Sequence, residues 1–285
     1  MRVYALSDLH VDYKRNMSLL QQMSDIEYVD DVLLLAGDIS DDLDQLKTCL
    51  AHLRAKFRFV FFVPGNHDLW VRRKECIDSI AKFWRILDLC QSLNVGTNPA
   101  KVGSSGDTAG VWIVPLFSWY VKPEEGDCSL YVPKAGDDPT LSMWSDNRFT
   151  RWPTSDNGEL VADYFLRLNE KHTCRTYDAP IISFSHFLPR TDLIFSSERE
   201  KIAAGKPRKD RHPRFNFSRV AGCTCLEKQL RRLNSAVHVY GHQHRDRFRL
   251  VNDVLYVSHC LGYPRDRIAE PNGEINCVPK LIWET

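Results

Sequence analysis

The stretch FRFVFFVPGNHDLW, residues 57–70, decides the fold class of this 285-residue chain. It begins with one of the most apolar runs in the sequence, as expected of a strand that is buried on both faces. The Pro-Gly pair that follows permits a sharp turn. Asn66, His67 and Asp68 come next. A buried strand that ends in three polar side chains indicates a ligand site, because ligands of α/β folds bind at the carboxyl ends of strands.

Similar short apolar runs alternate with segments of helical periodicity from the start of the chain. Amphipathic helices are predicted for residues 16–26, from an N-cap at Ser40 to Phe57, and for residues 74–93. This order of strand, helix and strand predicts βαβ units around a parallel sheet, and therefore an α/β fold. The predicted strands are residues 3–8, 31–38, 57–63, 111–117, 180–185 and 236–241, and a hairpin of residues 247–251 and 254–258 around Asn252-Asp253.

The overall charge favours neither nucleic acid nor a membrane as a partner. Lys and Arg number 38 and Asp and Glu number 37, which gives a formal net charge of +1. Bulk attraction to a polyanion is therefore small. No apolar stretch approaches the roughly 18 residues of a membrane span, and the chain opens with a strand rather than a leader of basic and apolar regions. We expect a cytoplasmic protein; the oligomeric state stays open.

The nine cysteines are expected to be reduced thiols. Their number is odd and no Cys-x-x-Cys pair occurs, which favours buried thiols in a reducing compartment over a disulfide framework. Cys223 and Cys225 form the only close pair in the sequence. They lack the second pair that a zinc site needs, so we interpret them as structural, with metal binding as the alternative.

Two segments differ in composition from the rest of the chain. Residues 118–158 are rich in Pro, Gly, Asp and Trp without a clear period, and are predicted to form a long loop or lid within a single domain of residues 1–285. Residues 199–232 hold eleven basic and three acidic residues, a balance of +8, whereas residues 1–50 hold four basic and ten acidic residues, a balance of −6. The basic segment either attracts an anionic substrate or forms a solvated surface.

Five of the predicted strands end in side chains that can bind metal ions. Mixed imidazole and carboxylate ligands suit borderline divalent ions such as Mn, Fe, Zn or Co. Seven ligands exceed the number that one tetrahedral ion takes. They fit two ions about 3.5–4 Å apart that share a bridging carboxylate. The candidate ligands are Asp8, His10, Asp38, Asn66, His186, His242 and His244.

The blocks that hold these residues resemble the motifs of the calcineurin-like metallophosphoesterase superfamily. They occur in the order of the family and span most of the chain. The resemblance implies an α/β fold of the αββα type, with two sheets in a sandwich, helices on both outer faces and a dinuclear metal site at the strand ends. The matching blocks are SDLH at 7–10, AGDIS at 36–40, PGNHD at 64–68, SHF at 185–187 and GHQH at 241–244.

The resemblance also implies a role for each residue of the site. His67 would be the general acid, or a donor to the phosphoryl group, and Asp41 would orient it. The reaction would be two-metal-dependent hydrolysis of a phosphate ester by in-line attack of a metal-bridging hydroxide. The implied ligands are Asp8, His10 and His244 for one ion and Asn66, His186 and His242 for the other, with Asp38 bridging both.

Other residues bear on the branch of the superfamily and on the class of substrate. Asp41-Asp42 and Asp68 depart from the pattern of the Ser/Thr protein phosphatases, and an acidic N-terminal surface argues against the DNA-repair nucleases of the superfamily. GNHDLW, PLFSWY and SHFLP resemble a single-domain branch of bacteria and plants. We predict a phosphomonoesterase that acts on a small metabolite or nucleotide. The alternatives are a phosphodiesterase or nuclease, and a non-catalytic scaffold of the same fold, which would have lost ligands.

Substrate-binding residues are predicted from the two unusual segments and from the C-terminal region. Trp119 offers a flat apolar face on which a base or ring can stack. Arg208 and Arg211 of the basic segment, and Arg265 in the sequence YPR, are candidates for contacts with phosphate oxygens. The alternative is that the tryptophans hold the loop to the body of the protein and that the cations are solvated.

Overall fold

The first sheet of the computed structural model contains the three strands that open the sequence. Its order is β10-β1-β2-β3. Strands β1 (Arg2–Leu6), β2 (Val32–Ala36) and β3 (Phe59–Val63) run parallel, and β10 (Lys280–Glu284) pairs antiparallel with β1. All five residues of β2 are buried, as a central strand covered on both faces requires. The structure describes residues 1–72, 76–103, 110–154, 158–198, 200, 202, 212–265 and 278–284.

The second sheet is made by the later strands, in the order β4-β5-β6-β7-β9-β8. Its four inner strands run parallel, and the two at its edges are antiparallel. The carboxyl ends of the inner strands therefore meet along one edge of the sheet. The strands are β4 (Ala100–Val102), β5 (Val111–Pro115), β6 (Ile181–Phe184), β7 (Val237–Val239), β9 (Val254–Ser258) and β8 (Arg247–Val251).

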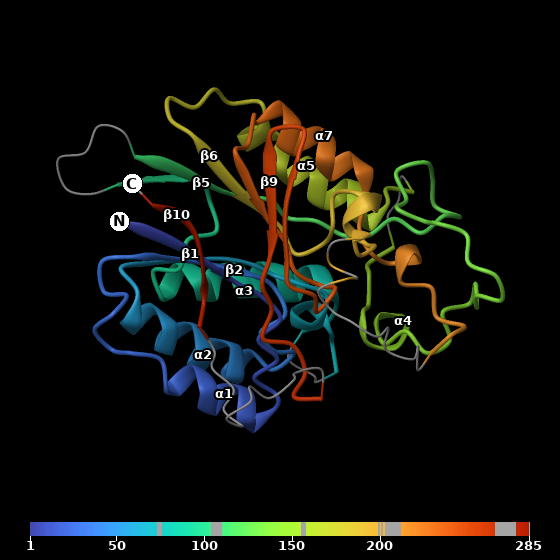
Figure 1. Ribbon diagram of the computed structural model, residues 1–285. Coiled ribbons are helices and arrows are strands. Elements are labelled where there is room, and N and C mark those ends of the chain that lie inside the picture. Colours follow the sequence, from blue (N-terminus) through green and yellow to red (C-terminus); the bar gives the residue numbers. More distant parts are fainter. Residues whose placement is uncertain are drawn as a thin grey trace.

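Helices cover the outer face of each sheet and complete a two-sheet αββα sandwich (Figure 1). Helices α1 (Lys14–Gln21), α2 (Leu43–Lys56) and α3 (Ser79–Ser92) lie on the side of the first sheet. Helices α5 (Val161–Thr173) and α7 (Thr224–Arg232) lie on the side of the second. None of the described helices has the length and apolarity that crossing a bilayer requires. The predicted sandwich is confirmed.

The ends of two helices differ from the prediction because the capping residues differ. Helix α2 is capped by Asp42, whose carboxylate accepts hydrogen bonds from the N–H groups of Asp44 and Gln45. Ser40 instead donates its hydroxyl to Asp12 at 2.7 Å. Helix α3 begins only at Ser79, because Asp78 caps it. The predicted hairpin is confirmed: residues 252 and 253 both have positive φ, 46° and 64°, the geometry of a type I′ turn.

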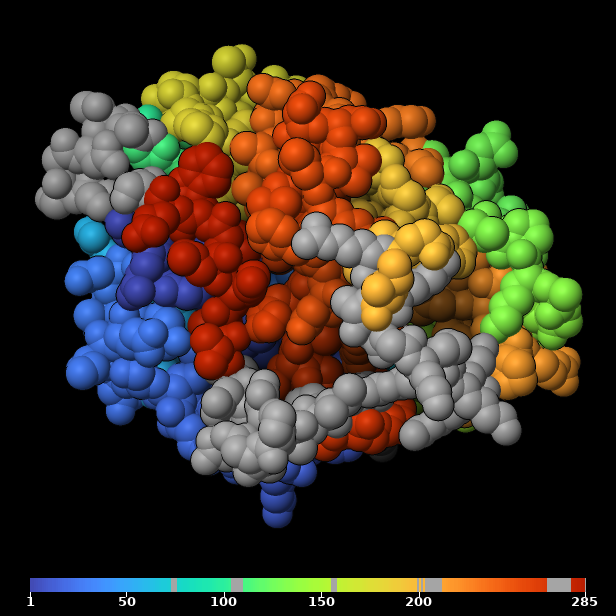
Figure 2. Space-filling view, in the orientation of Figure 1, coloured from blue at the N-terminus to red at the C-terminus, as the bar shows by residue number. Residues whose placement is uncertain are grey.

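The 118–158 segment lies against the body of the protein beside residues 212–225. Apart from the short helix α4 (Asp146–Phe149) it has no regular element among its described residues. Its backbone and side chains are bonded to the neighbouring segment, for example Asp138 N–H to the Arg214 carbonyl at 2.8 Å and Arg219 Nε to Asp137 at 2.8 Å. Figure 2 shows both segments side by side, in green and light orange at the right-hand edge.

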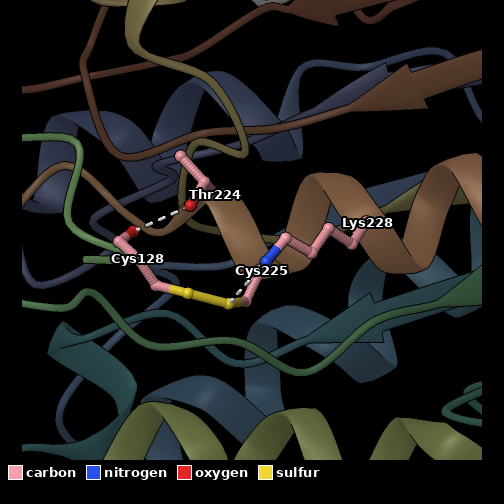
Figure 3. Close-up of a disulfide and its surroundings, with 4 residues drawn as sticks. All are labelled: Cys128, Thr224, Cys225 and Lys228. Atoms are coloured by element: carbon pink, nitrogen blue, oxygen red, sulfur yellow. Dashed lines mark hydrogen bonds between the residues drawn. A yellow bond between two sulfur atoms is a disulfide. The ribbon is translucent and has the colours of Figure 1, made fainter. Parts of the chain in front are cut away.

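A disulfide between Cys128 and Cys225 corrects the expectation of reduced thiols throughout (Figure 3). It joins the 118–158 segment to the first turn of α7. The backbone N–H of Thr224 donates to the Cys128 carbonyl at 2.8 Å beside it. The pair could not be predicted from the sequence, because its members are 97 residues apart and their Cα atoms lie 5.7 Å apart only in the folded chain. Cys223 is buried and lies outside the disulfide.

Candidate metal centre

The predicted ligands lie in the loops that follow five strand ends, where the two sheets meet. Those loops adopt an unusual backbone. Five of the ligand residues have positive φ, a conformation that costs a residue other than glycine about 1–2 kcal/mol and that often marks functional sites. These residues are Asp8 (53°), His10 (42°), Asp38 (59°), His242 (71°) and His244 (51°).

Backbone hydrogen bonds between the loops hold this conformation. The N–H of Asp8 donates to the Gly37 carbonyl at 2.9 Å, and the N–H of His10 donates to the Asp38 carbonyl at 3.0 Å. The N–H of His242, from the second sheet, donates to the Asp8 carboxylate at 3.0 Å. The loops after β1, β2 and β7 are therefore fixed relative to one another.

Asp68 connects the loops after β2 and β3. Its fully buried carboxylate accepts four backbone hydrogen bonds of 2.8–3.0 Å, from the N–H groups of Asp38, Ile39, Ser40 and Gly65. Burial raises the pKa of this carboxyl to about 6, although the four hydrogen bonds oppose the shift. The role of Asp68 could not be predicted from the sequence, because its partners are backbone groups that no motif displays.

Glycine is required where these loops approach each other most closely. A Cβ on Gly65 would lie 2.3 Å from Asp38 Oδ1 and 2.7 Å from the ring of His186. A Cβ on Gly37, whose φ is +82°, would lie 2.3 Å from His186 Nδ1. The two glycines before the polar residues thus admit the imidazole of the second sheet between the loops of the first.

The ligand atoms gather into two groups that share Asp38. In each group, one nitrogen or carboxylate oxygen from every member lies within 4.8 Å of the others. The first contains Asp8, His10, Asp38 and His244, and the second contains Asp38, His186 and His242. This is the arrangement expected of two ion sites joined by one carboxylate.

Carbonyl groups orient two of the imidazoles. His186 Nδ1 lies 2.8 Å from the Ala36 carbonyl, so Nδ1 carries the proton and Nε2 faces Asp38 Oδ1 at 3.5 Å. His242 Nε2 lies 2.9 Å from the Val220 carbonyl, which leaves its Nδ1 without a proton. In both residues the nitrogen that points to the centre therefore has a lone pair for a metal ion.

Asn66 is oriented by a residue of the 118–158 segment. Its amide nitrogen donates to Asp146 Oδ1 at 2.9 Å, so its amide oxygen turns toward His186 Nε2 at 3.1 Å. Trp70 Nε1 donates to the same carboxylate oxygen at 2.6 Å. Burial raises the pKa of Asp146 to about 6, against the hydrogen bonds from Asn66 and Trp70. Asp146 was missed in the sequence because it lies 80 residues from Asn66 in an irregular segment.

The donor set fits a pair of divalent cations. Asp8 and Asp38 are 0% and 2% exposed, and neither forms an ion pair with a Lys or Arg among the described residues. Burial, together with the charges of Asp68 and Asp8, raises the pKa of Asp38 well above its usual value. The Nε2 atoms of His10 and His244 lie only 2.9 Å apart. Buried carboxylates and facing imidazoles of this kind need positive charge between them.

Comparison with known sequences gives the family. The family model of calcineurin-like phosphoesterases matches residues 1–246. The chain belongs to the calcineurin-like phosphoesterase family. It is therefore a metal-dependent hydrolase of phosphate esters, and the two groups around Asp38 are its candidate metal sites.

The chain is also similar to one relative in sequence and to one solved structure in fold. This phosphoesterase is 26% identical over 278 residues to "[Acyl-carrier-protein] phosphodiesterase PptH" of Mycobacterium tuberculosis (strain ATCC 25618 / H37Rv), across 93% of this chain and 78% of the relative. It also superposes on the crystal structure of phosphopantetheinyl hydrolase (PptH) from M. tuberculosis with a TM-score of 0.68 and 23% identity, covering 93% of this chain and 90% of that chain. The superposition shows a shared fold.

His67 lies beside the two groups of ligand residues that share Asp38, which we call the metal groups. It belongs to the one-turn helix His67–Leu69. Its Nε2 is 3.9 Å from Asp38 Oδ2, and its ring packs on Trp70 with centroids 3.6 Å apart. Burial, with the neighbouring imidazoles of His10 and His244, lowers the pKa of His67 well below the usual value. The ring of His67 therefore lies next to the carboxylate that both groups share.

Asp41 does not orient His67 in this structure, contrary to the expectation from the motif. Its carboxylate lies 3.3 Å from Arg72 Nε, and no hydrogen bond joins it to His67 within the described part of the chain. The ring of His67 instead meets the hydroxyl of Tyr263, 3.2 Å from Nε2. Asp41 lies in the loop between β2 and α2, and its carboxylate faces Arg72 there.

The predicted substrate-binding residues have different outcomes. Trp119 is 4% exposed and packs against Tyr120, Trp152 and Phe187, so it belongs to the core and offers no face to a substrate. Its place in an irregular segment was misleading, because the segment itself is packed. Arg265 is exposed and lies over the ring of Tyr263 at 4.9 Å, close to the metal groups. Arg208 and Arg211 lie outside the described residues.

Proposed function

We propose that this phosphoesterase is a two-metal phosphodiesterase whose metal ions are held by Asp38 and six side chains around it. The observation that supports it is the sharing of Asp38 between two groups of ligand atoms, each within 4.8 Å. Asp8, His10 and His244 complete one site. Asn66, His186 and His242 complete the other. Two divalent ions supply the Lewis acidity that makes water nucleophilic near neutral pH and offsets charge on the phosphoryl oxygens.

The residues of the chain supply position and a proton. The carbonyls of Ala36 and Val220 fix the imidazoles of His186 and His242. His67 hydrogen-bonds the oxygen that departs from phosphorus and gives it a proton as the P–O bond breaks. Since the ester oxygen leaves as an alcohol, this proton is needed most when that alcohol is a weak acid.

The proposed substrate is a phosphodiester that links phosphopantetheine to a carrier protein. The support is the similarity over 93% of the chain to a protein named as an acyl-carrier-protein phosphodiesterase, and the solved PptH structure is named as a phosphopantetheinyl hydrolase. Hydrolysis would break the bond between phosphorus and the oxygen of the carrier protein. The carrier protein would keep a hydroxyl group, and phosphopantetheine would be released. This proposal differs from the sequence-based preference for a phosphomonoester of a small metabolite.

A substrate panel tests the proposal on the full chain after reconstitution with Mn, Fe, Zn or Co. The substrates are a carrier protein bearing phosphopantetheine, bis(p-nitrophenyl) phosphate, p-nitrophenyl phosphate and a single-stranded oligonucleotide. We expect the highest kcat/KM on the carrier protein, with mass spectrometry showing loss of the phosphopantetheine group. The metal-loaded His67→Asn variant is the control for contaminating hydrolases.

Other patterns of activity would contradict this function in distinct ways. Hydrolysis of p-nitrophenyl phosphate alone would support the monoesterase predicted from the sequence. Cleavage of the oligonucleotide, with affinity that falls steeply as salt rises, would indicate a nuclease. Bound metal without hydrolysis of any ester would indicate a scaffold.

A further inference from the structure

The hydroxyl of Tyr263 lies 3.2 Å from Nε2 of His67, within hydrogen-bonding distance. Tyr263 follows the second sheet, in the chain segment between β9 and β10. Its ring packs on His10 with centroids 4.4 Å apart and meets the ring of His244 at 4.6 Å. The tyrosine therefore touches both the first metal group and the side chain that we assign to proton transfer.

The position of the hydroxyl matters because of which nitrogen it meets. His67 Nε2 is also the nitrogen that lies 3.9 Å from Asp38 Oδ2, so it is the edge of the ring that faces the metal groups. A hydrogen bond at this nitrogen sets the direction of the ring relative to the place where a phosphate ester would bind. The contact agrees with proton donation by His67 when Nε2–H donates to the Tyr263 oxygen, because Nε2 then carries the proton that His67 would give to the leaving oxygen.

The motif predicted a different partner. Asp41 pairs with Arg72, and within the described residues Tyr263 is the side chain that hydrogen-bonds the ring of His67. Trp70 packs on one face of the imidazole. Packing alone does not decide which ring nitrogen faces the metal groups, because the ring can rotate about the Cβ–Cγ bond. A hydrogen bond to Nε2 does.

We propose that Tyr263 is the positioning residue for His67 and takes the place that the motif gives to Asp41. The inference deepens the proposed function and rests on it, because His67 must act as a proton donor for its position to matter. Tyr263 acts through His67. Its hydroxyl should therefore affect the step in which His67 gives up its proton, and should not affect the binding of metal.

Three variants separate this role from packing. Tyr263→Phe keeps the ring against His10 and removes the hydroxyl. Tyr13→Phe is the matched control, because Tyr13 packs on the ring of Tyr263 at 5.6 Å and is 44% exposed. His67→Asn, alone and combined with Tyr263→Phe, tests whether the tyrosine acts through the histidine. Metal content and the midpoint of thermal unfolding are measured for all of them.

The kinetic test uses phosphate esters that differ in the acidity of the leaving alcohol. We expect Tyr263→Phe to lower kcat by up to about 100-fold on an alkyl ester, since small misplacements of a catalytic group have effects of this size. The loss should be much smaller on a p-nitrophenyl ester, and KM should change little. Combined with His67→Asn, the tyrosine change should cause no further loss, because residues that act through one another are not additive.

A measurement without metal or substrate tests the contact itself. In the metal-free protein, the NMR signals of the His67 ring nitrogens and their protons should shift in Tyr263→Phe and stay in place in Tyr13→Phe. Unchanged His67 signals would overturn the inference. So would additive kinetic losses in the double variant, or an equal loss on alkyl and p-nitrophenyl esters with metal retained.

The outcomes also separate this inference from the proposed function. If the wild-type protein hydrolyses no ester, the proposed function is wrong. If the wild type is active and Tyr263→Phe matches it on every ester, the proposed function stands and the role of Tyr263 is wrong.

Discussion

Asp146 Oδ1 accepts a hydrogen bond from Nδ2 of Asn66 at 2.9 Å. The bond fixes which end of the Asn66 amide faces the metal groups, since the amide oxygen then lies 3.1 Å from His186 Nε2. The 118–158 segment, which holds Asp146, therefore contributes to the metal centre by orienting the ligand Asn66. Its contacts with the body and the disulfide to α7 hold that carboxylate in place.

Asp146→Ala should weaken binding of the metal ion that Asn66 helps to hold. Loss of a residue that orients a ligand typically costs 10- to 100-fold in metal affinity. Titration of the metal-free protein with Mn or Zn should show one of the two sites weakened by about this factor. Asp138→Asn is the control, since Asp138 lies in the same segment and its carboxylate bonds to the nearby Thr140 and Ser142. Equal weakening in both variants would mean that the segment acts through stability alone.

Asp68→Asn should destabilise the protein by about 2–4 kcal/mol, because the amide nitrogen faces backbone N–H groups that the carboxylate now satisfies. Urea unfolding of the metal-free protein measures the change. Asp30→Asn, at an exposed position, should stay within about 0.5 kcal/mol of the wild type. A wild-type free energy of unfolding in Asp68→Asn would show that the loops after β2 and β3 do not depend on this carboxylate.

His67→Asn should keep metal and lose turnover by about 10²–10⁴-fold, the usual contribution of a general acid. The loss should shrink for a p-nitrophenyl ester, whose leaving group needs little protonation. Steady-state kinetics with metal analysis on the same samples checks both statements. A uniform loss across leaving groups would assign His67 to binding of the phosphoryl group, and loss of metal would make it a ligand.

Much of the fold and of the ligand set could be predicted from the sequence because local patterns encode them. A strand such as β2 is a continuous apolar run, and Asp38 lies two residues after its end. Asp146, Tyr263 and the Cys128–Cys225 disulfide could not be predicted, because each depends on a contact between segments far apart in the chain. Trp119 was misassigned for the same reason: its partner Phe187 lies in the loop after β6.

Glu200 should make stability depend on acid pH. Its carboxylate accepts hydrogen bonds from Arg249 Nε at 2.9 Å and from Arg247 Nη1 at 2.5 Å, and Arg247 is buried. Burial would raise the pKa of Glu200, but the bonds from Arg249, Ser197 and Arg247 outweigh it and lower the pKa to about 2. The folded value lies below the unfolded value, so this stability is complete above about pH 4.5 and is lost as pH falls through about 2.

Glu200→Gln should therefore flatten the fall in stability between about pH 5 and pH 2.5. The difference from the wild type should be below about 3 kcal/mol, because solvent screens a side chain that is 30% exposed. Urea unfolding of the metal-free protein at several pH values gives the comparison, with Glu27→Gln at an exposed position as the control. Parallel curves for Glu200→Gln and the wild type would contradict the pairing with the two arginines.

The number of metal ions per chain tests the central claim most directly. Elemental analysis of the full chain after metal reconstitution and removal of excess metal should give about two ions for the wild type, as two ligand groups joined by one carboxylate require. Asp38→Asn should lower that number, because Asp38 belongs to both groups. A wild-type value near one, or two ions retained by Asp38→Asn, would contradict a metal pair bridged by Asp38.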